Sequence, residues 1–151
     1  DIKKYAQLVE DLFADLNIDV IIEPGRSLVG SSGIILSKVI RVKKGKNKKF
    51  LIIDAGMNNL IRPSLYGAFH NIIPVRLSTN KNEENYDIVG PICETGDIFV
   101  KNIKFQKLEK DDLIAICATG AYGSCMASNY NLRGEINEVF IKKKKINISN
   151  K

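Results

Sequence analysis

The first sixteen residues carry apolar side chains at alternating steps of three and four. Ile2, Tyr5, Val9, Leu12 and Leu16 make up this series. The spacing places them on one face of an amphipathic helix. An apolar helical face needs a surface to pack against, so we expect a packing partner for it.

A continuous apolar run, residues 20–22, follows this helix and leads directly into Glu23-Pro24-Gly25-Arg26. The run is typical of a buried parallel strand, and in an α/β barrel the carboxyl end of such a strand lies at the active-site face. Pro24 fixes its own φ, and Gly25 permits a tight backbone path. We therefore expect Glu23 and Arg26 to project from a stiff turn.

From Ile34 onward the pattern changes to short runs rich in β-branched residues, separated by turn-forming stretches. The runs cover residues 34–42, 50–53, 72–77, 86–92, 98–100, 113–118 and 138–141. They predict a mainly β fold, a Greek-key barrel or sandwich, with one short helix starting near Tyr122. The change of pattern divides the chain into residues 1–33 and residues 34–151.

The chain has 151 residues, of which 44% are hydrophobic. This is enough for one compact core, or for a domain plus a piece of another. The longest apolar run is far too short to span a bilayer, and no charged-then-apolar leader opens the sequence. We expect no membrane contact and a cytoplasmic location.

The formal net charge is +6, and the densest basic stretch is Lys142-Lys143-Lys144-Lys145. A basic β-barrel that binds nucleic acid is one reading of this charge. Such a module carries aromatic residues between its basic ones, whereas this chain has 7% aromatic residues and no tryptophan. We expect the lysine run to be a solvated tail after the last strand and expect no nucleic-acid binding.

The three cysteines, Cys93, Cys117 and Cys125, include no Cys-x-x-Cys pair. Neither a disulfide framework nor a zinc site is indicated, and we expect no metal. Cys117 lies in an apolar run and is expected to be a small buried residue. His70 is the single histidine. With no partner at ligand spacing, it is expected to be structural or exposed.

Three polar groups are candidates for chemistry. Arg62 and Tyr66 are four residues apart, so a short helix with Pro63 in its first turn would point both the same way and form a carboxylate clamp. A surface ion pair and a packing tyrosine are the alternative. Cys93 and Glu94 lie on a polar turn, where an exposed thiol can act as a general acid. Tyr122 lies in Gly120-Ala121-Tyr122-Gly123, where the glycines let the backbone approach a ligand closely. An aromatic residue that only fills a turn is the alternative.

The motifs occur in the order Glu23-Pro24-Gly25-Arg26, then residues 59–67, Cys93-Glu94-Thr95-Gly96-Asp97, residues 118–123 and residues 126–131. From about residue 18 to about residue 146 the chain resembles the C-terminal half of the diaminopimelate decarboxylases, pyridoxal-phosphate enzymes that form lysine. The resemblance implies the last strand and helices of a (β/α)8 barrel over residues 1–33 and a β-domain over residues 34–151. The family's cofactor-binding lysine lies in earlier barrel strands, so we expect a fragment of an enzyme that is inactive alone.

The resemblance also implies roles. Glu23 pairs with the cofactor's pyridine nitrogen, and Pro24, Gly25 and Arg26 belong to the same cofactor motif; Arg26 holds either the phosphate or a substrate carboxylate. Arg62 and Tyr66 bind a carboxylate of the substrate, and Tyr122 meets both cofactor and substrate.

Cys93 is the family's proton donor, and Glu94 recognises the distal ammonium group of meso-diaminopimelate. The family commonly has serine where Thr95 stands here, and Cys125 has no assigned role. The resemblance further implies a homodimer with a composite active site. Decarboxylases of ornithine, arginine or carboxynorspermidine are the nearest alternatives, but their substrates lack the second carboxylate that Arg62 and Tyr66 suit.

Overall fold

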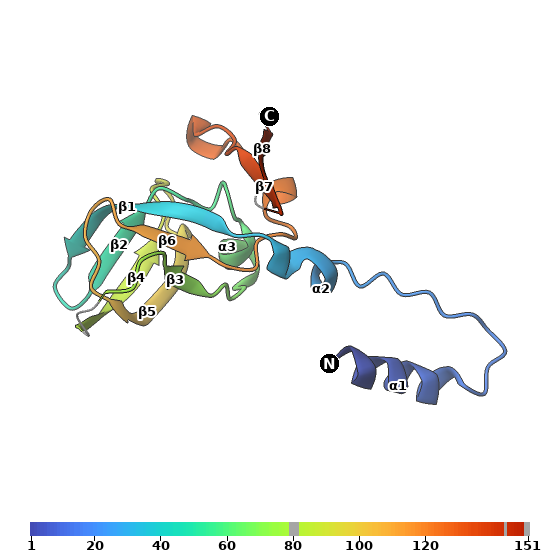
Figure 1. The fold of residues 1–151 in the computed structure, drawn as a ribbon. Coiled ribbons are helices and arrows are strands. Elements are labelled where there is room, and N and C mark those ends of the chain that lie inside the picture. The colour runs from blue at the N-terminus through green and yellow to red at the C-terminus, as the bar shows by residue number, and fades with distance from the viewer. Residues whose placement is uncertain (79–81, 144, 150–151) are drawn as a thin grey trace.

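The computed structural model describes residues 1–78, 82–143 and 145–149. A six-stranded sheet forms the body of the molecule, and the N-terminal helix lies apart from it at the end of an extended segment (Figure 1). Among the described residues, no helix has both the length and the apolar character needed to cross a bilayer.

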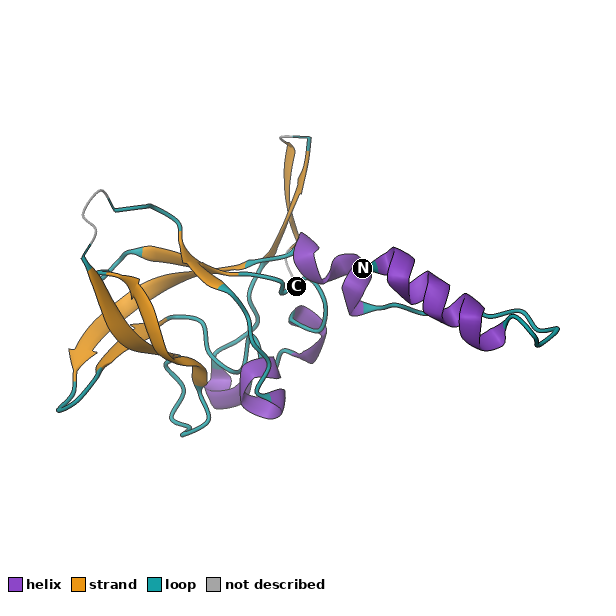
Figure 2. Ribbon diagram, turned by 90° about the horizontal axis from the view of Figure 1, so that it is seen from below, coloured by secondary structure: helices purple, strands orange, loops and turns teal. Residues whose placement is uncertain are grey.

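The sheet has the strand order β3-β6-β1-β2-β4-β5. All neighbouring strands are antiparallel except β2 and β4, which are parallel. The strands are β1 (Ile35–Lys44), β2 (Lys49–Ile53), β3 (Ile72–Pro74), β4 (Glu83–Val89), β5 (Ile98–Gln106) and β6 (Leu113–Ile116). Figure 2 shows the strong twist of this sheet. The sequence prediction of a mainly β fold is confirmed.

Alternation along the strands places one face of the sheet in a common core. In β1, Ile35, Ser37 and Val39 are buried, while the residues between them are exposed. Leu51 and Ile53 of β2 are also buried. The other residues of the core cluster are Ala55, Leu60, Ile72, Tyr86, Ile88, Phe99, Phe105, Leu108, Ile114 and Ile116. Burial of these side chains stabilises the fold by about 1.5–3 kcal/mol for each large aliphatic one.

The helices of the body are short and lie in the loops that enter and leave the sheet. They are α2 (Arg26–Val29), η1 (Gly30–Ser32), α3 (Arg62–Tyr66), η2 (Ser124–Met126) and η3 (Tyr130–Leu132). Pro63 lies in the first turn of α3, as the sequence predicted. The helix expected near Tyr122 is found two residues later as η2.

A two-stranded hairpin, β7 (Glu138–Lys142) and β8 (Lys145–Ser149), ends the described chain. Lys142, Lys143 and Lys145 are exposed, as predicted, but the prediction that the lysine run forms a tail after the last strand is wrong. Lys142 of β7 pairs with Lys145 of β8 across the hairpin. Val139 and Ile141 of β7 face Ile148 and Ile146 of β8, which gives the hairpin one exposed apolar face.

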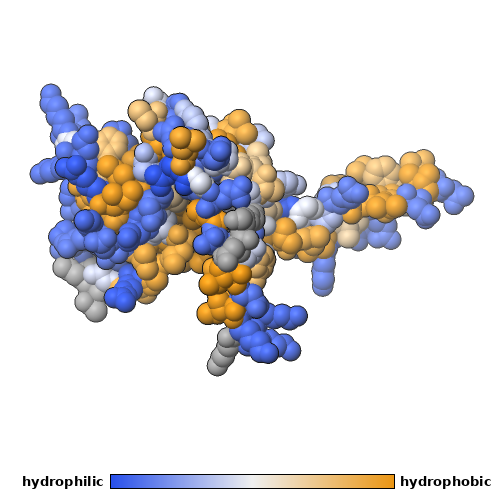
Figure 3. Space-filling model, turned by 90° about the horizontal axis from the view of Figure 1, so that it is seen from above, coloured by the Kyte–Doolittle hydropathy of each residue, from blue (hydrophilic) through white to orange (hydrophobic). Residues whose placement is uncertain are grey.

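The N-terminal helix α1 (Ile2–Phe13) confirms the predicted helical spacing, and none of its residues is buried. Its apolar residues and those of the hairpin are visible on the surface in Figure 3. The predicted strand at residues 20–22 is not formed. These residues have no strand partner among the described part of the chain, and Ile21 is 90% exposed. A parallel strand needs hydrogen-bonded neighbours, and this chain offers none there.

Candidate functional site

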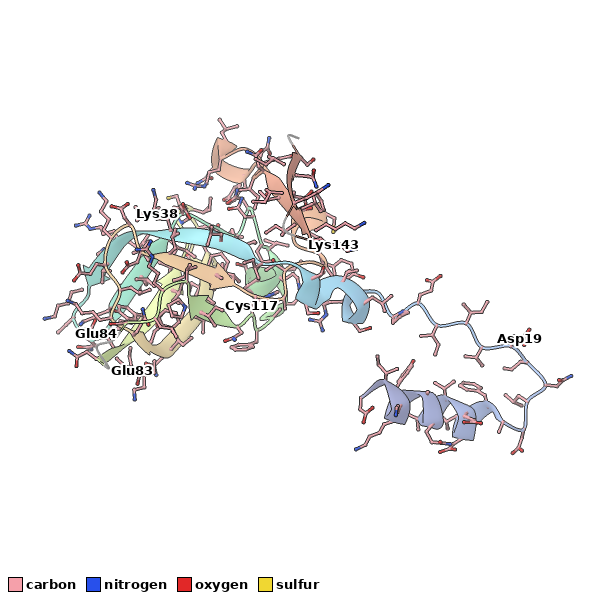
Figure 4. The ribbon with its side chains drawn as sticks, viewed as in Figure 1. Asp19, Lys38, Glu83, Glu84, Cys117 and Lys143 are labelled. Atoms are coloured by element: carbon pink, nitrogen blue, oxygen red, sulfur yellow. The ribbon has the colours of Figure 1, made fainter. Side chains whose placement is uncertain are left out.

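The predicted site residues lie where α2, α3 and two loops meet at one end of the sheet. Figure 4 gives the orientation: Glu83 and Glu84 lie at the opposite end, while Cys117 lies on the side of α2. The end near Glu84 holds an open pocket of about 440 Å³ lined by residues of the β1–β2 turn and of β4. No predicted site residue lines that pocket.

Two glycines bring the segment after Gly25 against the loop of residues 118–123. The Thr119 amide donates to the Gly33 carbonyl, and the Gly120 amide donates to the Gly30 carbonyl, both at 3.0 Å. A Cβ at Gly120 would lie 2.2 Å from the Val29 carbonyl oxygen. Only a residue without a side chain permits this approach, so Gly120 fixes the position of α2 beside the loop.

Tyr122 follows directly and lies against Gly25. A Cβ on Gly25 would lie 3.2 Å from the Tyr122 hydroxyl oxygen, and Gly25 has a φ of +50°. Tyr122 itself has a φ of 58°. Left-handed backbone at a tyrosine is sterically unfavourable, and such conformations concentrate at functional sites. The structure thus joins two predicted motifs that are almost one hundred residues apart.

Arg62 extends this cluster from α3. Its guanidinium carbon is 5.6 Å from the centroid of the Tyr66 ring and 5.8 Å from that of Tyr122. Both distances are within the range of cation–π attraction. The helical spacing therefore directs Arg62 and Tyr66 to the same side, as predicted. The Arg62 Nε is buried and lacks a hydrogen-bond partner among the described residues.

The Cys93 loop (residues 90–97) is attached to α3 by a hydrogen bond of 2.6 Å from the Ser64 hydroxyl to the Gly96 carbonyl. Cys93 and Glu94 are exposed, as predicted for a thiol on a polar turn. The Gly96 amide donates to the Glu94 carboxylate at 3.3 Å. Among the described residues, no hydrogen bond or ion pair joins Cys93 or Glu94 to Arg62, Tyr66 or Tyr122.

Glu23, Pro24 and Arg26 are exposed. Among the described residues, no hydrogen bond or ion pair joins their side chains to Arg62, Tyr66 or Tyr122. The chain thus brings Gly25, Tyr122, Arg62 and Tyr66 together. It leaves the carboxylate and guanidinium of the first motif facing solvent.

Asp97 is a functional candidate to which sequence reasoning gave no role. Asp97 is 3% exposed, and its carboxylate accepts hydrogen bonds of 2.7 Å from the amides of Ile92 and Met57. Burial raises the pKa of this carboxyl, while the two amides and the charge of Arg133 act in the opposite direction. In the sequence, Asp97 stands between Gly96 and the apolar strand β5, and this position was the only local sign that it could have a specific role.

Asn58 and His70 are two further buried polar residues. Asn58 is 2% exposed, and neither polar atom of its side chain has a partner in the described chain. It lines an open pocket of about 370 Å³ with residues 128–130, and its carbonyl accepts from the Ser128 amide. His70 is buried, and its Nδ1 lies 3.0 Å from the Cys117 carbonyl. A carbonyl only accepts, so Nδ1 is the donor there. Cys117 is half-buried.

Comparison with known proteins places this geometry in a family. The family described as pyridoxal-dependent decarboxylase, C-terminal sheet domain, matches residues 11–120. A diaminopimelate decarboxylase of Zymomonas mobilis is 46% identical over 140 residues, which cover 93% of this chain and 33% of the relative.

Solved structures give the same result. The chain AQ1208 from Aquifex aeolicus has a TM-score of 0.89 at 40% identity, covering 96% of this chain and 36% of that one. Diaminopimelate decarboxylase from Helicobacter pylori, complexed with L-lysine, has a TM-score of 0.88 at 42% identity, covering 98% and 36%. The chain therefore spans about a third of the length of the relatives it matches. The resemblance read from the motifs is confirmed, and this chain belongs to the pyridoxal-dependent decarboxylases, of which it contains the C-terminal sheet domain.

Proposed function

We propose that this chain is the C-terminal part of a diaminopimelate decarboxylase, an enzyme that releases carbon dioxide from the D-centre of meso-2,6-diaminopimelate and gives L-lysine. The observation that carries the proposal is the cluster of Arg62, Tyr66, Tyr122 and Gly25. It provides a cation and two phenol rings in a fixed arrangement at the end of the sheet. Relatives with that name align over almost the whole chain.

The cofactor would be pyridoxal phosphate, which takes up the electron pair left when carbon dioxide departs. The residue types present here suit this cofactor. Gly25 carries no side chain, which lets the Tyr122 hydroxyl lie directly against the backbone of the motif that would hold the cofactor. Glu23 would hold the proton on the pyridine nitrogen, and Arg26 would bind either the phosphate or a substrate carboxylate.

Arg62 and Tyr66 would hold the distal carboxylate of the substrate. A guanidinium offers a planar fork of donors, and the Arg62 Nε has no partner among the described residues that would compete for it. A phenol adds one donor. Ornithine and arginine have no carboxylate at the chain end, so this pair favours meso-diaminopimelate over those substrates.

Cys93 would donate the proton to Cα after carbon dioxide has left, and Glu94 would bind the distal ammonium group. Both side chains are exposed on a loop with a closed base. An exposed thiol can reach a substrate carried by another surface.

A composite site in a homodimer agrees with the geometry of α3. Ser64 is two residues from both Arg62 and Tyr66, which is about 200° around a helix. Ser64 binds the Cys93 loop through Gly96, so this loop is attached to the face of α3 opposite the Arg62 pair. We infer that Cys93 and Glu94 complete the site of a partner subunit rather than that of their own.

The domain boundary proposed here lies near residues 32–33. Residues 1–33 would belong to a (β/α)8 barrel, and residues 34–151 would form the β-domain. The exposed apolar residues of α1 and of residues 18–22 support this division, because they need a surface that the sheet does not supply. A cytoplasmic location is proposed together with the biosynthetic role.

The test joins the first two thirds of the Zymomonas mobilis relative to this chain, so that a complete enzyme is measured. Cys93→Ala should lower kcat by about 10²–10⁴-fold, the usual contribution of a general acid, with a much smaller change in KM. Arg62→Gln should instead mainly raise KM for meso-diaminopimelate. Cys125→Ala is the matched control, because Cys125 is also an exposed free thiol. Normal turnover by Cys93→Ala with loss in Cys125→Ala would assign the acid to the other thiol.

A further inference from the structure

The buried carboxylate of Asp97 connects two loops that the proposed function uses. Its Oδ1 accepts from the Met57 amide, and its Oδ2 accepts from the Ile92 amide, each at 2.7 Å. Ile92 directly precedes Cys93. Met57 opens the loop of residues 57–61, which leads into α3 and Arg62. One side chain is therefore bonded to the backbone next to the thiol and to the backbone that enters the carboxylate clamp.

The backbone of Asp97 closes the Cys93 loop as well. The Gly90 amide donates to the Asp97 carbonyl at 3.0 Å, and the Asp97 amide donates to the Glu94 carbonyl at 3.1 Å. Four hydrogen bonds thus converge on this one residue, two at its backbone and two at its carboxylate. Cys93 and Glu94 lie at the exposed tip of a loop whose base is fixed.

The carboxylate of Asp97 is also packed closely against a glycine. A Cβ built on Gly90 would lie 2.3 Å from Asp97 Oδ2 and 2.4 Å from Oδ1. The carboxylate therefore lies directly against the backbone of Gly90. A side chain at position 90 would push it away from one or both amides.

We propose that Asp97 is a positioning residue, which sets the place of Cys93 and Glu94 relative to α3 by accepting one backbone amide from each of the two loops. The proposal rests on the proposed function for its catalytic consequence, but its geometric part does not. An ionised carboxylate has two acceptor oxygens, one for each amide. An asparagine of the same shape has one acceptor, and its amide group would face a backbone N–H as a second donor.

The first experiment uses this chain and needs no cofactor. Hydrogen exchange of the Ile92 and Met57 amides is measured in the wild type and in Asp97→Asn. At least one of the two amides should exchange at least about 10-fold faster in the variant, because it has lost its acceptor. Gly90→Ala should give the same result without altering the carboxylate.

Two matched variants serve as controls. Asp112→Asn makes the same chemical change at an exposed turn, where the carboxylate accepts from the Glu109 amide, and should leave Ile92 and Met57 unchanged. Gly96→Ala adds a methyl group to the same loop, where the nearest atoms are 4.0 Å away, and should also leave both amides unchanged.

Unchanged exchange at both amides in Asp97→Asn would overturn the proposal. Equal acceleration at core amides such as Ile88 and Ile114 would overturn it too, because the carboxylate would then hold the fold and not the loop. In the joined enzyme, Asp97→Asn should lower kcat by about 10–100-fold and also raise KM, because the proton donor Cys93 and the substrate-binding Glu94 would both be displaced. If Cys93→Ala remained fully active while Asp97→Asn accelerated exchange, the function assigned to Cys93 would fail and the positioning role would stand.

Discussion

The six-stranded sheet and the N-terminal segment (residues 1–26) are both rich in isoleucine, leucine and valine, yet they have opposite environments. Ile53 in β2 is 0% exposed, whereas Ile21 in the segment is 90% exposed. The sheet buries its apolar face against its own strands, which lie up to eighty residues apart. The segment has no such neighbours among the described residues. Whether an apolar side chain is buried therefore depends on residues far away in the sequence. The sheet has these packing partners within the described chain, and the segment does not.

The residues of the proposed site lie at the border between these two regions. Gly25 comes from the end of the segment, while Tyr122, Arg62 and Tyr66 come from loops of the sheet. The loops of the sheet place Tyr122, whose backbone is left-handed, against Arg62. The segment presents Glu23 and Arg26 to solvent. The sheet side is thus formed in this chain, and the segment side needs further structure around it.

The largest expected effect concerns the need for that further structure. This chain alone should show no turnover of meso-diaminopimelate and no absorbance band from covalently bound pyridoxal phosphate. The reason is that Glu23 and Arg26 face solvent and give only part of a site. The joined enzyme should show both. A specific band from the chain alone at stoichiometric cofactor would contradict the difference drawn between the two regions.

A matched pair of substitutions measures the same difference as stability. Ile53→Ala should lower the free energy of unfolding by about 2–5 kcal/mol, because it opens a cavity in a packed core. Ile21→Ala should change it by less than about 0.5 kcal/mol, because the side chain is exposed. Urea titration followed by circular dichroism measures both. Equal losses would mean that the segment packs on the sheet in solution.

A smaller effect concerns the stability of the sheet at high pH, where Tyr86 ionises. Burial, followed by the hydrogen bond to Glu84, raises the pKa of Tyr86 to about 12; the hydroxyl donates to the Glu84 carboxylate at 2.6 Å. The folded state therefore holds this proton more tightly than the unfolded state, whose tyrosine pKa is about 10. The resulting stability is complete below pH 10 and is lost as the pH rises towards 12. It amounts to about 2–3 kcal/mol.

Tyr86→Phe tests this because phenylalanine has no proton to lose. The stability difference between wild type and Tyr86→Phe should shrink by that amount between pH 10 and pH 12, as followed by urea midpoints. The raised pKa values of Lys104 and Lys107, each due to a hydrogen-bonded carboxylate, affect both proteins equally and cancel. A difference that stays constant across this range would contradict the assignment.

The local sequence pattern was sufficient to predict the strands of the sheet. Their apolar side chains pack in a core that is formed by residues of this chain alone. The pattern was not sufficient for residues 20–22, where the strand pattern is present but hydrogen-bonded neighbours are absent. The hairpin β7–β8 was missed in part because the lysine run hid the alternation of Ile146 and Ile148. The role of Asp97 depends on the Met57 amide, forty residues away, and on the space beside Gly90. No local pattern contains that information.

The site residues divide in the same way. The four-residue spacing of Arg62 and Tyr66 was enough to predict that they share a face, because one turn of helix sets it. Family resemblance implied that Tyr122 meets the same cofactor and substrate as these residues, but the contact of Arg62 with Tyr122 and the approach of Tyr122 to Gly25 were not predicted. They follow from the close passage of Gly120 past Val29 and Gly33, which is a packing event between distant segments.

The measurement that tests the account most directly is complementation between two inactive variants of the joined enzyme. One carries Cys93→Ala and the other Glu23→Ala; they are dissociated, mixed in equal amounts and allowed to re-form dimers. If each site uses Glu23 of one subunit and Cys93 of the other, a mixed dimer has one intact site and one site with both lesions. Random pairing makes about half of the dimers mixed, so activity should recover to about one quarter of the wild-type value. If mass measurement confirms subunit exchange and activity stays at the level of the parent variants, each site is built within one chain and the composite-site account is wrong.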